Sequence, residues 1–220
     1  MVLRQSYRRT LVHKVGLVVV DPVRAFTDSA GVIGRIHGAV EFRPIRETVE
    51  RLASFAATHK GPKVWVTSQY TPGQFTGGNL DEPLARLCTD PSSSDCVWDA
   101  ELKPPADAVV VTKTSMDANS APAFVDAVEA MVDEVDALFI TGFWLTACVA
   151  ATAASSTERL SGRTPVVIPL SLAATRLGLY DTADDHPPER DVALRLEELR
   201  RRGVVVCEYP GEWRSNLVGT

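Results

Sequence analysis

The chain has 220 residues, of which 45% are hydrophobic and 23% charged, and this composition is typical of one globular domain with a substantial core. Its formal net charge of -5 argues against nucleic acid or an anionic membrane as the main partner, because both attract clustered positive charge. No apolar run approaches the roughly 20 residues of a membrane span, and the first residues lack the apolar core of a signal peptide. We therefore expect a cytoplasmic protein that binds a small molecule, with residues 1–220 as one domain and 1–13 as its N-terminal arm.

Six short runs rich in valine and isoleucine predict β-strands. In chain order they are 15–20, 63–67, 108–112, 137–141, 165–169 and 204–209. Most are apolar on consecutive positions, as in strands that are buried on both faces. Helical spacing of apolar residues lies between them, at 45–56, 124–135 and 192–199. This alternation predicts an α/β fold, a three-layer α-β-α sandwich around a mostly parallel, six-stranded Rossmann-like sheet.

Two segments interrupt the alternation of strands and helices. Residues 69–107 are too long for an ordinary connection, so we expect a functional cover or an oligomer contact there, with a short helix near 84–87. Residues 178–190 form a polar excursion that contains two prolines. Cys88 and Cys96 lie close together in the first segment, but no histidine accompanies them, and we interpret them as loop cysteines rather than as a zinc site.

Three chemically distinct side chains follow predicted strands. Asp21 follows the first strand, Lys113 the third and Cys148 the fourth. Ligands of an open parallel sheet bind beyond the carboxyl ends of its strands, so all three are candidates for one site. Taken singly, Asp21 could cap a turn, Lys113 could be a solvated charge and Cys148 could be core packing. Together they supply what a catalytic thiol needs, namely a base, a cation and a proton donor.

The segments "DPVRAF", "VTKTSMDAN" and "GFWLTACVAATA" carry a resemblance in their order and spacing. In these motifs the chain resembles the isochorismatase-like cysteine hydrolases, which include nicotinamidases and carbamoylsarcosine amidases, over about residues 15–207. The resemblance implies the isochorismatase-like hydrolase fold. It also implies Asp21 as general acid and base, Lys113 as the tuning cation and Cys148 as nucleophile. The expected reaction is hydrolysis of an amide, carbamoyl or lactam C–N bond through a thioester.

The resemblance also implies an oxyanion hole made of the backbone N–H groups of Trp144 and Cys148, with a cis peptide bond between Phe143 and Trp144. We expect Thr146 to cap the following helix, which would place Cys148 in its first turn and lower the thiol pKa. Lys113 would have to reach inward over the second strand to meet Asp21. Candidate substrate-binding residues are Phe26, Gln69, Tyr70, Trp98, Met116 and Trp144.

The chain departs from the family's motifs at Val23, Asn119, Pro122 and Trp144, and these positions bear on substrate identity. The histidines that bind metal in the nicotinamidase branch are missing after the second strand, so we expect no metal and no other cofactor, and nicotinamide is disfavoured as substrate. A homodimer or homotetramer is expected from the resemblance. Two alternatives stay open: an enol-ether hydrolase that needs no cysteine, and a non-catalytic binding or assembly protein on the same fold.

Overall fold

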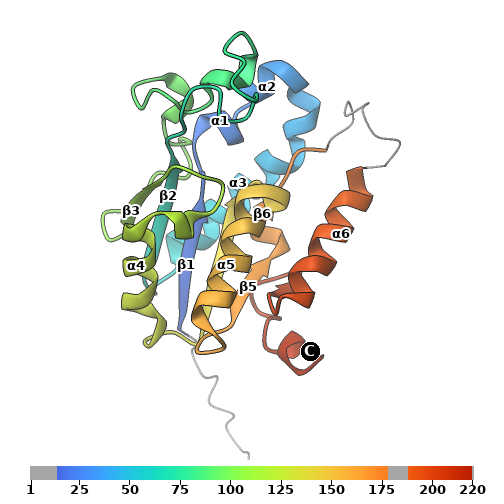
Figure 1. Cartoon of the computed structure of the whole chain (residues 1–220). Helices are drawn as coiled ribbons and strands as arrows, with labels where there is room; N and C mark the ends of the chain where they lie inside the picture. The colour runs from blue at the N-terminus through green and yellow to red at the C-terminus, as the bar shows by residue number, and fades with distance from the viewer. Residues whose placement is uncertain (1–13, 178–187, 220) are drawn as a thin grey trace, which may run out of the picture.

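A computed structural model describes residues 14–177 and 188–219 of the chain (Figure 1). Its described strands form one parallel sheet in the order β3-β2-β1-β4-β5-β7, and the short β6 pairs with β4. The strands are β1 Val15–Val20, β2 Lys63–Ser68, β3 Val109–Lys113, β4 Ala137–Phe143, β5 Val166–Pro169, β6 Ala173–Ala174 and β7 Val205–Cys207. The predicted α/β class and mostly parallel sheet are therefore confirmed, with the short β6 added to the six predicted strands.

The helices lie on both sides of this sheet. They are α1 Arg24–Thr27, α2 Val32–His37, α3 Arg43–Thr58, α4 Pro122–Val132, α5 Ala150–Leu160 and α6 Pro188–Arg201. Helices α3, α4 and α6 occupy the regions where helical spacing was found. Helices α1 and α2 were not predicted, because they are too short to show a repeating apolar pattern. The expected helix near 84–87 is a single 3-10 turn, Pro83–Arg86.

Alternation along β1 divides the core between the two faces of the sheet. Val18 and Val20 pack with α4, α5 and α6, whereas Leu17 and Val19 pack with α3 and the segment that follows β2. Both sets are fully buried, as expected for a central parallel strand. Strand β3 differs because it lies at the edge of the sheet, where Val109 and Val110 are about half exposed. The expectation that strands are buried on both faces is wrong for β3.

The carboxyl ends of the strands form one end of the molecule, and the segment that follows β2 folds over it beside α1 and α2 (Figure 1). Backbone hydrogen bonds join this covering segment to the residues that follow β1. The N–H of Arg24 donates to the carbonyl of Val97 (2.9 Å), and Val23 forms an antiparallel bridge with Trp98. The expected N-terminal arm lies outside the described residues, as does most of 178–190. Among the residues described, no helix has the length and apolar character needed to cross a bilayer.

Candidate active site

Asp21 directly follows β1 and is fully buried. Its φ of 53° lies in the left-handed region, which aspartate tolerates better than most residues. The backbone is held there because the Asp21 N–H donates to the carbonyl of Val66 in β2 (2.8 Å). Its Oδ1 accepts a hydrogen bond from Ser68 Oγ (2.7 Å), while Oδ2 accepts no well-directed hydrogen bond from any described residue. One carboxylate oxygen is thus fixed by a hydrogen bond, and the other faces the Lys113 ammonium.

Lys113 reaches Asp21 across β2, as the strand order requires. Its backbone position pairs in register with Ser68, the last residue of β2. The ammonium Nζ lies 2.6 Å from Ser68 Oγ and 3.0 Å from Asp21 Oδ2, and both charged side chains are fully buried. The small serine side chain leaves room for the lysine to pass and hydrogen-bonds both ions. Sequence reasoning identified the lysine and the aspartate but missed the serine that lies between them.

Cys148 lies beyond the end of β4, in a π-helical turn, Leu145–Val149, that runs into α5. The predicted cap at Thr146 is wrong, because the turn begins after Trp144, whose carbonyl accepts from the N–H groups of both Ala147 (3.0 Å) and Val149 (3.1 Å). The hydroxyl of Thr146 instead contacts that of Thr175. The Phe143–Trp144 peptide bond is cis, at the position that the resemblance implies.

The thiol of Cys148 lies close to both ions. Lys113 Nζ is 3.5 Å from Cys148 Sγ. Burial and the nearby Asp21 carboxylate raise the pKa of the Cys148 thiol to about 12, although Lys113 acts in the opposite direction. The expectation of a lowered thiol pKa is therefore wrong, because desolvation and the carboxylate outweigh the ammonium. The thiol is protonated at neutral pH and needs a base to become a nucleophile.

Lys113 keeps its charge in this buried site. Burial alone would lower its pKa, but the Asp21 carboxylate and the Cys148 sulfur raise the pKa above its usual value. Its Nζ is also within hydrogen-bond distance of the Tyr70 hydroxyl (2.8 Å) and the Ser115 carbonyl (3.0 Å). An ammonium has three hydrogens to divide among these five neighbours. The Lys113 ammonium can therefore stabilise a thiolate on Cys148 without a movement of the lysine side chain.

Tyr70 joins this network to a neighbouring chamber. Its hydroxyl lies 3.7 Å from Cys148 Sγ and 2.8 Å from Ser68 Oγ, and burial raises its pKa, so the phenol stays neutral. The chamber beyond it has a volume of about 250 Å³. Most of its described walls are apolar, with polar groups at a few positions: Phe26, Ile33, His37, Tyr70, Phe75, Leu84, Leu87, Met116, Trp144, Ala147, Cys148 and Arg176. A thiol, a carboxylate and an ammonium thus meet beside a space of small-molecule size.

Comparison with known proteins assigns the chain to a family. The family model for the isochorismatase domain matches residues 15–175 of the chain. The chain belongs to the isochorismatase family. No curated protein matches it in sequence. Its fold is similar to that of N-carbamoylsarcosine amidase from Thermoplasma acidophilum, with 20% identity over 88% of this chain and 95% of that one and a TM-score of 0.57.

Two further solved structures share the isochorismatase family fold. The pyrazinamidase of Pyrococcus horikoshii, solved in complex with zinc, is 18% identical over 89% of this chain and 99% of its own, with a TM-score of 0.64. An isochorismatase family protein from Desulfovibrio vulgaris subsp. vulgaris str. Hildenborough is 15% identical over 94% of this chain and 100% of its own, with a TM-score of 0.63. At these identities the likeness concerns the fold, and the family is one of hydrolases with amidases among its relatives.

Within this isochorismatase family site, four of the six candidate substrate-binding residues line the chamber: Phe26, Tyr70, Met116 and Trp144. The other two lie elsewhere. Gln69 is exposed, and its backbone N–H donates to the carbonyl of Lys113 (2.8 Å); Trp98 packs in the core beside Val23. Several lining residues were missed, because α2 and the residues after β6 carry no pattern that connects them to the motifs.

Of the four departures from the isochorismatase family motifs, one lines the chamber. Trp144 does so: its indole Nε1 donates to the Phe26 carbonyl (3.3 Å), and its ring packs edge-on against Phe26 and Phe42. Val23 is buried in the core and Pro122 begins α4. We expected all four departures to bear on the substrate. For Trp144, which lines the chamber, this stays a prediction.

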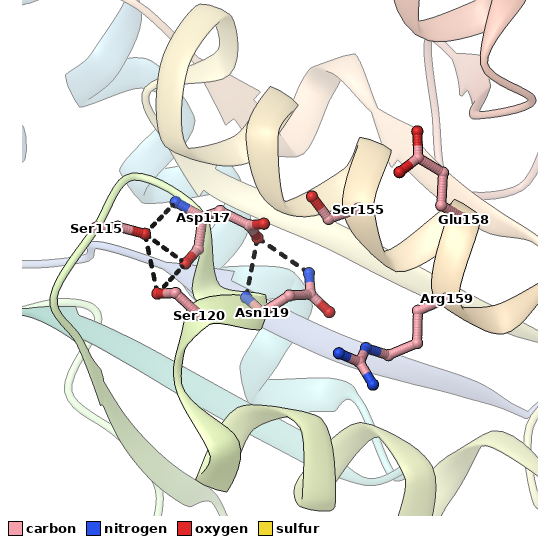
Figure 2. Close-up of a pocket in the computed structure, with 7 residues that line it drawn as sticks. All are labelled: Ser115, Asp117, Asn119, Ser120, Ser155, Glu158 and Arg159. Carbon is pink, nitrogen blue, oxygen red and sulfur yellow. Dashed lines mark hydrogen bonds between the residues drawn. The ribbon is translucent and has the colours of Figure 1, made fainter.

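Asn119 does not belong to the described lining of the chamber but links the turn after β3 to α5 (Figure 2). It lies in the turn after β3, across a polar depression from Ser155, Glu158 and Arg159 of α5. Its side-chain Nδ2 lies within hydrogen-bond distance of Asp117 Oδ1 (3.0 Å), the carbonyl of Thr152 (3.2 Å) and Ser156 Oγ (3.1 Å), and shares its two hydrogens among them. These bonds join the turn that follows Lys113 to the helix that follows Cys148. The residue therefore fixes two parts of the site relative to each other.

Whether the described residues can hold a metal ion depends on how their possible ligands are arranged. Within 14–177 and 188–219, no three His, Cys, Asp or Glu side chains come together as a metal would require. The segment after β2, where the resemblance implies metal-binding histidines in the nicotinamidase branch, reads "SQYTPGQF" and offers no histidine. The described residues do not fit a metal site.

Proposed function

We propose that the protein is a cysteine-dependent hydrolase that cleaves the C–N bond of a small amide, carbamoyl or lactam substrate through a thioester. The observation that carries the proposal is the buried contact of three groups beside the chamber: Lys113 Nζ lies 3.0 Å from Asp21 Oδ2 and 3.5 Å from Cys148 Sγ. Buried ion pairs are expensive to maintain for stability alone. A thiol next to such a pair, at the wall of a cavity, is suited to nucleophilic catalysis.

The first half of the proposed reaction forms the thioester. Asp21 Oδ2 takes the thiol proton as Cys148 Sγ attacks the carbonyl carbon, and Lys113 favours the developing thiolate. Backbone N–H groups of Trp144 and Cys148, as the family resemblance implies, hold the oxyanion of the tetrahedral intermediate. Asp21 then gives the same proton to the nitrogen as the C–N bond breaks. An amine or ammonia leaves, and the acyl group stays on sulfur.

The second half of the proposed reaction restores the enzyme. Asp21, again a carboxylate, takes a proton from water as the water oxygen attacks the thioester carbon. The C–S bond then breaks, the acid product leaves, and the proton returns to the sulfur of Cys148. One water is consumed for each C–N bond broken, and no oxidant, metal or other cofactor enters the balance.

The test is a Cys148→Ala variant assayed against a panel of amides and ureas for release of amine or ammonia. We expect turnover to fall at least about a thousandfold, because removal of a covalent nucleophile has effects of this order or larger. Intact mass of the wild-type protein during turnover should show an acyl adduct that the variant lacks. The loss of one small buried side chain should lower the free energy of unfolding by only about 1 kcal/mol.

The matched control is Cys207→Ala. Cys207 is equally buried but lies in β7, and we expect this variant to keep wild-type turnover. If Cys148→Ala retained most of its turnover, the thioester mechanism would be wrong and the enol-ether reaction, which needs only the acid and the cation, would be favoured. If the wild-type protein formed no adduct and turned over no member of the panel, the non-catalytic alternative would be favoured.

A further inference from the structure

We infer that the chamber beside Cys148 selects uncharged amides with a compact apolar group, and discriminates against amides that carry a carboxylate. This inference rests on the proposed function, because it names the substrate class of that same site. It is carried by three features of the chamber: its balanced charges, its apolar wall and rim, and its size.

The described charges around the chamber are balanced within the protein. Arg176 lines the wall, where its side chain is 15% exposed and its Nη1 lies 3.5 Å from Oε2 of the fully buried Glu41. Its guanidinium also lies over the Trp144 ring, 5.8 Å from the centroid. On the other side, Lys113 is paired with Asp21. A carboxylate on the ligand would therefore add a net negative charge to a largely apolar space, and the desolvation of that charge is costly.

The wall and the rim of the chamber are apolar. Phe26 and Ile33 are almost fully buried in the wall, next to Trp144. Two large apolar side chains at the same chamber are exposed, Met116 by 47% and Phe75 by 37%. Phe75 is held edge-on against Tyr70, with ring centroids 4.7 Å apart. Exposed apolar side chains that border a cavity are typical of a binding site for an apolar ligand.

The size of the chamber limits the ligand. Its volume of about 250 Å³ corresponds to roughly eight water molecules at ~30 Å³ each. A ligand that fills it therefore has on the order of eight non-hydrogen atoms. A branched aliphatic amide of this size would place its amide at Cys148 and its hydrocarbon against Phe26 and Trp144.

The experiment compares two amides of equal heavy-atom count and shape. 4-Methylpentanamide ends in an isopropyl group, and succinamate carries a carboxylate in its place. Both amides are assayed at the same pH and ionic strength. We expect kcat/KM for 4-methylpentanamide to exceed that for succinamate at least about tenfold. Equal values, or a preference for succinamate, would overturn the inference.

A charge added at the rim tests the electrostatic part of the inference. Met116→Lys places a cation at an exposed lining position, and should reduce the preference for the neutral amide at least about threefold. The matched control is Leu80→Lys, which adds the same charge at an exposed residue of the segment that follows β2, outside the described lining. This control should keep the wild-type preference. A preference that both variants change equally, or that Met116→Lys leaves unchanged, would contradict the role of the chamber's charge balance.

Failure of the inference can be separated from failure of the proposed function by acylation with N-acetylimidazole, a small activated acyl donor of about the size that the chamber holds. Acetylation of Cys148 and turnover of some amides, without the expected preference, would overturn the substrate class alone. No acetylation of Cys148, together with no amide turnover, would overturn both.

Discussion

At the scale of single residues, Asp21 has two opposite effects on Cys148. Burial and, after it, the charge of Asp21 raise the pKa of the thiol and keep the sulfur protonated at rest, yet in the proposed reaction Asp21 Oδ2 takes that same proton during attack. The thiol would then become a nucleophile mainly when a substrate is present. Such an arrangement protects a buried thiol from alkylation and oxidation by reagents that do not fit the chamber.

Asp21→Asn should separate these two effects. Asparagine also tolerates a left-handed backbone, so the fold should be retained. Hydrolysis should fall about 10²- to 10⁴-fold, because an amide cannot accept the proton. The pKa of Cys148 should fall at the same time, because Lys113 remains and the carboxylate does not. The measurement is the rate of iodoacetamide labelling at Cys148 between pH 6 and 10: its rise should move to lower pH in the variant, and an unchanged profile would contradict the electrostatic role.

Trp144→Ala should widen the range of substrates. The backbone N–H at this position is kept, whereas the indole wall beside Phe26 and Phe42 is lost. We expect KM to rise for amides that fill the chamber and larger amides to be accepted, while Cys148 can still be acylated by N-acetylimidazole. Trp144→Phe is the control and should keep most of the wild-type preference. Unchanged KM values and an unchanged substrate range in Trp144→Ala would show that the ring only packs against the core.

At the scale of elements, the apolar runs of the sequence predict the sheet and the three catalytic candidates. Asp21, Lys113 and Cys148 lie at or soon after the ends of these runs. The pairing register could not be predicted, because it is set by contacts between strands far apart in the chain. That register places Ser68 opposite Lys113 and thereby completes the buried network. Strand β6 has two residues and no pattern of its own, so Arg176, which follows it closely, could not be connected to the site.

Gly142→Ala tests how closely β4 and β1 must approach beside the site. Gly142 has φ 101°, and a Cβ there would lie 2.2 Å from the carbonyl oxygen of Val20, which directly precedes Asp21. Because both partners are backbone, the strands must move apart, and we expect a loss of several kcal/mol in the free energy of unfolding together with loss of activity. Gly38→Ala is the control: its φ is also positive (88°), but nothing lies within 4 Å of the added Cβ. It should lose about 1–2 kcal/mol. Urea unfolding measures both, and equal losses would contradict the steric explanation.

At the scale of the whole molecule, the chain has the isochorismatase family fold, and its described residues bring no three metal-binding side chains together. We therefore expect turnover to survive exhaustive treatment with EDTA followed by desalting, with less than about a twofold change. Metal analysis of the purified protein by mass spectrometry is the second readout. Loss of turnover that zinc restores, or a stoichiometric metal, would show that the proposed mechanism is incomplete.

Lys113, the proposed catalytic cation, is the last residue of the edge strand β3. Strand β3 has a neighbour on one side, β2, and presents Val109 and Val110 partly to solvent. Edge elements of a sheet open more readily than central ones, because fewer bonds must break. Fraying of β3 would withdraw Lys113 while β1 and β4 still held Asp21 and Cys148 in place. Activity should consequently disappear at a lower urea concentration than the global transition, and amide hydrogens of β3 should exchange before those of β1, so that the working lifetime of the enzyme is set by its least supported strand.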